Sequence, residues 1–297
     1  MSGSFWKSMR RVFVFLFWLA SGLPAQISDP FFFIQGSDPQ FGHFAKNKDL
    51  SQETANFQFF IATVNRLKPV FVVLTGDLVN RARNPEQIAE FKRIAAALDK
   101  SIPLYLLPGN HDIGDHPEPM HLESWRKNFG ADHWAFRKAD TVFIGFNSAL
   151  VHSVKAPSDE VEKQYVWLQA ELAKARREGA RRVIVFQHHS WFLSSFGEED
   201  KYVNIPATQR HKYFQLFRSY GVTHIFAGHM HKNFLASTDG IEMVTTGAIG
   251  LPRGEERSGF RIVTVRDSAV AHQYYDFGAV PNQAPFSSAA ARSYCRS

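Results

Sequence analysis

Apolar runs of strand length alternate with segments of helical period along most of this 297-residue chain. A run of about four to eight apolar residues suits one buried strand, whereas apolar side chains three and four positions apart form one face of a helix. The alternation predicts an α/β fold with parallel strands. The five expected buried strands, with the polar residues that follow them, lie in residues 31–40, 70–77, 102–112, 182–189 and 222–231.

Four helices are expected between these strands. In the first, apolar side chains recur at helical spacing up to Leu67, Ser51 is a candidate N-cap, and Pro69 ends the pattern. Asn84 and Pro85 suit the cap and first residue of the second helix. The third and fourth helices are expected in residues 159–177 and 206–220, which Gly179 and Gly221 would close.

The pattern changes after residue 233 to short strand-like runs in residues 234–237, 242–246, 260–265 and 269–277. The Asp239-Gly240 pair between the first two predicts a tight turn, so this part is expected to form antiparallel hairpins. From about Val280 the chain is rich in Pro, Ser and Ala and offers little to bury. We therefore expect one domain over residues 26–279 and a flexible tail over residues 280–297.

The first 25 residues have the layout of a secretory signal peptide. Lys7, Arg10 and Arg11 precede an apolar run over residues 12–20, and small or turn-forming residues follow as far as Ala25. An uncleaved N-terminal membrane anchor is the alternative, but the run is shorter than the roughly 20 apolar residues that span a bilayer. The paired arginines also resemble a twin-arginine signal. Export, to the periplasm or the outside of the cell, is the expectation.

Charge and cysteine content narrow the picture further. Removing residues 1–25 leaves 31 basic against 28 acidic residues, a net charge of +3, which is too small to indicate nucleic-acid binding. With Cys295 as the only cysteine, an intramolecular disulfide and a thiolate metal site are excluded. Nothing in the sequence assigns an oligomeric state.

Oxygen and nitrogen donors follow successive buried strands. In an α/β sheet the loops beyond the C-terminal strand ends form the binding crevice, so these side chains are expected to converge. One such dipeptide alone would indicate only a turn, but donors recurring at the same end of five strands indicate a metal site for Mn, Fe or Zn. The donors are Asp38 and Gln40, Asp77, Asn110 with His111 and Asp112, His188 with His189, and His229 with His231.

Other candidate residues have a plainer structural interpretation. Neighbouring side chains on a regular strand point to opposite faces, so His189 is expected to be structural if His188 binds metal. The same interpretation is preferred for His43, His211 and His224. Arg253 and Arg257 lie in a glycine-containing loop near residue 250, where guanidinium groups could contact phosphate.

Taken in order, the motifs D-x-Q, G-D, G-N-H-D, Q-H and G-H-x-H resemble those of the calcineurin-like metallophosphoesterases over residues 31–277. The fuller strings FIQGSDPQFG, GNHDIG, IVFQH, GHMHKN and AIG are similar to those of a serine/threonine phosphatase subgroup, which also carries glutamine at the position of Gln40. The resemblance implies a four-layer αββα sandwich of two mixed β-sheets flanked by helices, with two metal ions.

The resemblance also implies a role for each motif residue. Asp38, Gln40, Asp77 and His231 would surround the first metal ion, and Asp77, Asn110, His188 and His229 the second. Asp77 would bridge the two ions, between which a water would become the nucleophile. His111 would protonate the leaving oxygen or steady the phosphoryl group, with Asp112 orienting its ring.

The expected activity is hydrolysis of a phosphomonoester, including phosphoprotein-like substrates, by in-line attack of a metal-bridging hydroxide. A phosphodiesterase acting on nucleotides or lipid head groups is the alternative within enzymes. A non-catalytic binding module with the same fold is the alternative outside them. Loss of catalysis would be accompanied by replaced ligands or a replaced His111, and here only position 40 departs from the commonest pattern, so an enzyme is preferred.

Overall fold

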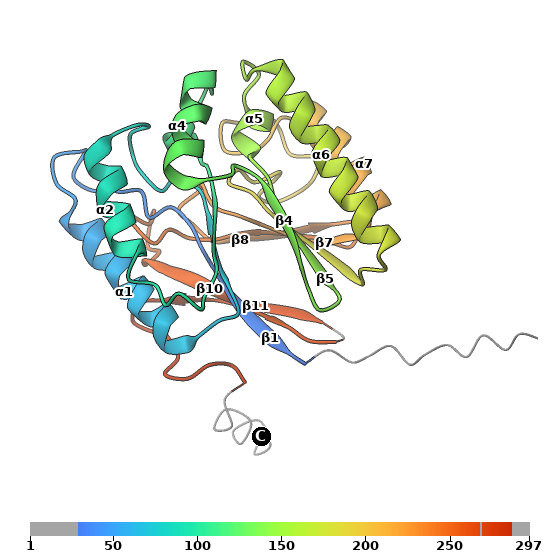
Figure 1. The fold of residues 1–297 in the computed structure, drawn as a ribbon. Helices are drawn as coiled ribbons and strands as arrows, with labels where there is room; N and C mark the ends of the chain where they lie inside the picture. The colour runs from blue at the N-terminus through green and yellow to red at the C-terminus, as the bar shows by residue number, and fades with distance from the viewer. Residues whose placement is uncertain (1–28, 268, 287–297) are drawn as a thin grey trace, which may run out of the picture.

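The computed structural model describes residues 29–267 and 269–286, which form two β-sheets with helices on both outer sides (Figure 1). The first sheet has the order β11-β10-β1-β2-β3 and the second β4-β5-β6-β7-β9-β8. The strands of the first sheet are β1 (Phe31–Gly36), β2 (Val72–Thr75), β3 (Leu104–Leu107), β10 (Gly259–Val265) and β11 (Val270–Asp276). Those of the second are β4 (Trp134–Lys138), β5 (Thr141–Gly145), β6 (Arg182–Phe186), β7 (Val222–Ala227), β8 (Phe234–Thr238) and β9 (Ile241–Thr245).

Both sheets are mixed. Strands β1, β2 and β3 are parallel, and β10 joins the free edge of β1 in antiparallel register, with Phe33 opposite Val263. In the second sheet β5, β6, β7 and β9 are parallel, while β4 and β8 close the two edges as antiparallel partners. The parallel strands run in one direction within each sheet, so their C-terminal ends bring several loops to one edge.

Three apolar clusters separate the four layers. Helices α1 (Ser51–Leu67) and α2 (Pro85–Ala95) pack on the outer face of the first sheet, where Phe57 and Phe91 stack with ring centroids 5.1 Å apart. Helices α6 (Ser158–Arg177) and α7 (Ala207–Ser219) cover the second sheet. Between the sheets lies an aromatic-rich cluster in which Phe33 contacts Phe71, Phe143 and other rings. The four-layer αββα sandwich is thereby confirmed.

The sequence pattern located most of these elements. Asn84 caps α2 by accepting the Gln87 amide, and Asp239-Gly240 makes the β8–β9 turn with positive φ at both residues. Ser51, however, does not cap α1: Leu50 stands at the N-cap position and the Ser51 hydroxyl binds Asp49. The pattern missed the β4–β5 hairpin and three short helices, α3 (Asn110–Ile113), α4 (Pro119–Phe129) and α5 (Ser148–His152).

Packing continues past residue 279, where the tail was expected to begin. Arg66 on α1 donates to the carbonyls of Pro281 and Asn282, and Phe286 lies beside Phe32 with ring centroids 6.5 Å apart. The predicted signal peptide and residues 287–297 lie outside the described residues, so those expectations stay predictions. Among the helices of the described part, none is both long enough and apolar enough to cross a membrane.

Candidate metal centre

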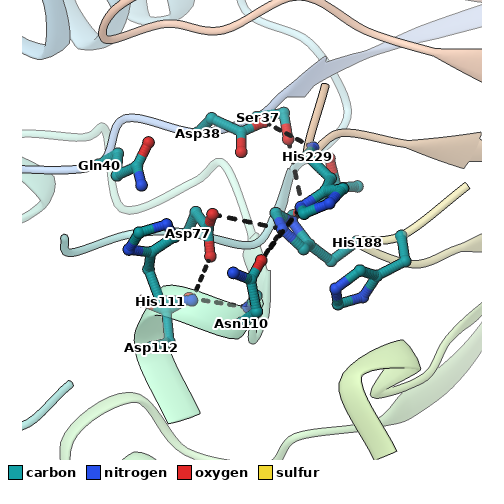
Figure 2. Close-up of polar contacts among 12 residues, drawn as sticks. Ser37, Asp38, Gln40, Asp77, Asn110, His111, Asp112, His188 and His229 are labelled. Carbon is teal, nitrogen blue, oxygen red and sulfur yellow. Dashed lines mark hydrogen bonds and ion pairs between the residues drawn. The ribbon is translucent and has the colours of Figure 1, made fainter. Parts of the chain in front are cut away.

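The donors predicted from the sequence meet at one edge of the sandwich, where loops follow β1, β2, β3, β6 and β7 (Figure 2). Most of the predicted ligand positions have an unusual backbone. Positive φ angles between 39° and 69° occur at Asp38, Gln40, Asp77, His229 and His231. Each costs a non-glycine residue about 1–3 kcal/mol and persists where the surrounding structure holds it, which is typical of functional sites.

The motif glycines allow these loops to approach one another. A Cβ atom on Gly109 would stand 2.5 Å from the Asp77 backbone nitrogen and would collide with the Asp77 carboxylate. A Cβ on Gly228 would collide with Ser37 and stand 2.6 Å from Asp38 Oδ2. Glycine is therefore required at both positions by close packing against the candidate ligands.

One group of donors converges on Asn110, whose Oδ1 lies 3.1 Å from His188 Nε2 and 3.1 Å from His229 Nδ1. Asp77 Oδ2 lies 3.4 Å from the same His188 nitrogen. Asn110, Asp77 and both histidines are buried. Four donors from four different loops thus enclose a single position, as the second ligand set requires.

A second group lies beside the first. Asp38 Oδ1 is 3.4 Å from His231 Nε2, and donor atoms of Asp38, Asp77 and His231 lie within 4.8 Å of one another. Figure 2 shows Gln40 next to Asp38, on the side of Asp77 away from His229. Asp77 therefore belongs to both groups.

Backbone carbonyls fix the tautomers of two of the histidines. His188 Nδ1 lies 2.7 Å from the Thr75 carbonyl, and His231 Nδ1 contacts the Leu251 carbonyl. Since a carbonyl only accepts, each Nδ1 carries a proton and each Nε2 of the neutral ring keeps its lone pair. In both residues the lone pair faces the carboxylates, as a metal ligand requires.

The charge balance of the cluster favours a cation. Burial lowers the pKa of His188, but the charge and hydrogen bond of Asp77 outweigh burial and raise it to about 9, so Nε2 carries a proton that a bound cation would displace. Burial and the charge of His188 lower the pKa of His229 to about 3, so His229 is neutral, as a ligand must be. A pocket that stabilises positive charge among two buried carboxylates fits a divalent ion.

His111 is held beside Asp77 by its backbone amide, which donates to Asp77 Oδ1 over 2.8 Å. Its Nδ1 donates to the Asn80 carbonyl, 2.9 Å away, and so leaves Nε2 free. The expectation that Asp112 orients this ring is wrong. The Asp112 carboxylate instead accepts the backbone amides of Leu78, Val79 and Gly109, and thereby fixes the Asp77 loop.

The alternation of side chains along a strand does not apply to His189. Strand β6 ends at Phe186, and His188 and His189 both lie in the loop beyond it. A ring nitrogen of His189 lies within 4.8 Å of those of His188 and His229. Ser148 Oγ, however, accepts the amides of both His188 and His189, so its proton goes to His189 Nδ1, 3.1 Å away. His189 Nε2 then carries a proton, but it is buried without a hydrogen-bond partner among the described residues, so the structural role of His189 stays a prediction.

The two arginines lie in different surroundings. The Arg253 amide donates to the His231 carbonyl over 3.0 Å, and the Arg253 charge contributes to a lowered pKa of His43, after burial and His231. Arg257 lines a hollow of about 560 Å³ together with Lys232, Gly254, Glu255, Glu256, Tyr274 and Asp276, none of which is a candidate metal ligand. Arg253 is the better placed of the two for substrate.

Comparison with known proteins agrees with this geometry. The family model described as calcineurin-like phosphoesterase matches residues 25–233. The chain belongs to the calcineurin-like phosphoesterase family. It is 33% identical to the bovine and human serine/threonine-protein phosphatases CPPED1 over 262 residues, 83% of each chain, and 32% identical to the zebrafish one.

Solved structures share the fold at low identity. A dimetal phosphatase from Danio rerio superposes with a TM-score of 0.59 at 15% identity, covering 84% of this chain and 100% of the other. A purple acid phosphatase from yellow lupin gives 0.63 at 15% identity, covering 87% of this chain and 53% of the other. Family membership makes this calcineurin-like phosphoesterase a phosphoester hydrolase that uses divalent metal ions.

The calcineurin-like phosphoesterase site contains polar residues that the sequence reasoning did not select. Asn80 accepts from Gln40 and His111, Ser148 holds the loop of His188, and Tyr202 and Asp115 contact Asn110. No periodic pattern or motif marks them. For Tyr202, the contact follows from long-range folding, since Tyr202 is 92 residues from Asn110.

Gln40 is oriented by a chain of amides. Asn80 Nδ2 donates to Asn47 Oδ1 over 2.8 Å, which leaves Asn80 Oδ1 to accept Gln40 Nε2 at 3.3 Å. Gln40 Oε1 is then the opposite end of the amide, buried and without a hydrogen-bond partner among the described residues. A buried acceptor without a donor is costly unless a ligand satisfies it. We propose that Gln40 Oε1 is a metal ligand.

Replacing Gln40 tests this proposal. Gln40→His should bind Zn²⁺ about tenfold more tightly at the first site, roughly 1.4 kcal/mol, because imidazole is a softer donor than an amide oxygen. The activating-metal profile should move away from Mn²⁺. Titration calorimetry with each metal measures both effects. Unchanged affinity and preference in Gln40→His and also in Gln40→Ala would show that Gln40 is not a ligand.

Proposed function

We propose that this calcineurin-like phosphoesterase hydrolyses phosphomonoesters at a centre of two divalent metal ions. The observation that carries the proposal is the position of Asp77 between two donor groups. It lies within 4.8 Å of Asp38 and His231, and its Oδ2 lies 3.4 Å from His188. A carboxylate has two oxygens and a negative charge, so it can hold two cations and offset their repulsion.

The residues of the chain divide the remaining tasks. Asp38, Gln40, Asp77 and His231 would hold the first ion, and Asp77, Asn110, His188 and His229 the second; Mn, Fe and Zn suit these donors. When bound, such ions polarise the phosphoryl group and make water a nucleophile at neutral pH. His111 keeps its Nδ1 proton on the Asn80 carbonyl and presents Nε2, which in the imidazolium form would donate the second ring proton to the leaving oxygen and leave the neutral ring.

The preference for phosphomonoesters, including phosphoserine and phosphothreonine in proteins, is supported by relatives named serine/threonine-protein phosphatases over 83% of their length. The Arg253 amide donates to the His231 carbonyl, and the guanidinium charge of Arg253 would suit a dianionic phosphate. We also propose that the protein is exported, and this part of the proposal rests only on the sequence of residues 1–25.

Paired substrates test this proposal. With Mn²⁺ present, p-nitrophenyl phosphate should be hydrolysed with kcat/KM about tenfold or more above that for bis-p-nitrophenyl phosphate, a difference of about 1.4 kcal/mol. Phosphoserine and phosphothreonine peptides should also be substrates. The Asp77→Asn protein, purified in parallel, controls for contaminating phosphatases. A preference for the diester would instead favour the phosphodiesterase alternative.

A further inference from the structure

The carboxamide of Asn110 is held at both ends. Its Oδ1 faces His188 and His229, while its Nδ2 lies 3.0 Å from Asp115 Oδ1 and 3.1 Å from the Tyr202 hydroxyl. The Tyr202 hydroxyl in turn lies 3.0 Å from the same Asp115 oxygen. Asn110, Tyr202 and Asp115 therefore form a closed ring of three hydrogen bonds next to the second ligand set.

The direction of each bond in this ring follows from chemistry. A carboxylate only accepts, so Asn110 Nδ2 and the Tyr202 hydroxyl both donate to Asp115. The Tyr202 oxygen accepts the second N–H of Asn110. The ring thus has acceptors for the amide nitrogen and no donor for an amide oxygen. It selects the orientation in which Asn110 Oδ1 faces the metal position, although the flipped amide has nearly the same shape.

The loop that carries Tyr202 is held in place by hydrogen bonds to its backbone carbonyls. The Tyr202 carbonyl lies 2.9 Å from His152 Nε2. Arg210, fully buried on α7, donates to the carbonyls of Phe196, Glu198 and Ile205 on both sides of Tyr202. Because the loop is already ordered, the Tyr202 hydroxyl needs little further entropy loss to hold its partner.

The Tyr202 hydroxyl donates its proton to Asp115 Oδ1 over 3.0 Å. Tyr202 is therefore an orienting group for Asn110 rather than a proton donor to substrate.

We propose that Tyr202 and Asp115 are positioning residues that fix the Asn110 carboxamide for the second metal ion. This rests on the proposed two-metal centre. Groups that orient a metal ligand are typically worth 10- to 100-fold in metal affinity. The contribution should fall on the second site, because neither residue contacts Asp38, Gln40 or His231 in the described hydrogen bonds and ion pairs.

Titration of the metal-free protein with Mn²⁺ by calorimetry tests the proposal. Tyr202→Phe should weaken Mn²⁺ binding at the second site about 10- to 100-fold and leave binding at the first site unchanged. Asp115→Ala should have a similar effect. The double variant should lose less than the product of the two single losses, because both act through one ring. Tyr165→Phe, which removes a hydroxyl from a ring packed on Tyr213, is the matched control.

Activity gives an independent readout. The activity of Tyr202→Phe should rise with Mn²⁺ over a concentration range shifted 10- to 100-fold upward. Unchanged affinity for Mn²⁺ at the second site would overturn the proposal, as would equal weakening of both sites. A lowered kcat with an unshifted Mn²⁺ dependence would also overturn it, since Tyr202 would then act on substrate. A wild-type protein that binds one Mn²⁺ would instead contradict the two-metal centre itself.

Discussion

Asp77→Asn should abolish phosphoester hydrolysis and leave at least one of the two metal positions empty. The substitution keeps the shape of the side chain, and the amide oxygen can still accept the His111 backbone N–H as Asp77 Oδ1 does. It removes the charge that two adjacent dications need between them. The bound metal ions stabilise the transition state by several kcal/mol, and losing this stabilisation should lower kcat by at least about 10³-fold. Metal analysis and kcat measure the two effects.

The matched control is Asp159→Asn on the exposed face of α6, where Asp159 pairs with Lys163 over 3.0 Å. Solvent screens fully exposed pairs of this kind, so activity and metal content should match the wild type. Thermal unfolding of both variants shows whether the fold is kept. Two metal ions bound to Asp77→Asn at wild-type affinity would refute the bridging role.

His111→Ala should lower kcat by about 10²- to 10⁴-fold while both metal ions stay bound. The His111 ring is tied to the Asn80 carbonyl and is not among the nitrogens that meet at Asn110 Oδ1. Removing it should therefore spare the ligand sets. Steady-state kinetics and metal analysis of the same preparation measure the two outcomes.

Substrates with different leaving groups distinguish the two roles considered for His111, which are protonation of the leaving oxygen and contact with the phosphoryl group. A poor leaving group such as the serine oxygen of a phosphopeptide needs protonation more than p-nitrophenolate does. As a proton donor, His111 should therefore matter more for the peptide. Equal losses with both substrates would favour contact with the phosphoryl group. Retained turnover would contradict both roles, and loss of metal would make His111 a ligand. His211→Ala, on the exposed face of α7, is the control.

Most of the site was predictable because its donors follow buried strands, and apolar strands are the strongest pattern in the sequence. The parallel arrangement then brings their ends together. The hairpin of β4 and β5 was missed because β4 is half-exposed and mixes apolar with charged residues. Its turn contains Ala139 with a φ of 53°, a residue that gives no turn signal in the sequence.

One expectation about the site was wrong and the argument for another does not hold, and both have a clear physical cause. The resemblance implied that Asp112 orients the His111 ring, but α3 is helical there, and adjacent residues on a helix do not face each other. His189 was argued from strand alternation, yet the strand ends before it. Tyr202 reaches Asn110 only through the fold of the loop after β6, whereas Asp115 follows α3 five residues from Asn110, and no local pattern predicts either contact.

Anomalous diffraction from crystals grown with Mn²⁺ tests the central claim most directly. We expect two peaks about 3.5–4 Å apart with Asp77 between them. Asp38, Gln40 and His231 should bound the first peak, and Asn110, His188 and His229 the second. A single peak, or a pair in which Asp77 contacts only one ion, would contradict the two-metal centre on which the proposed mechanism depends.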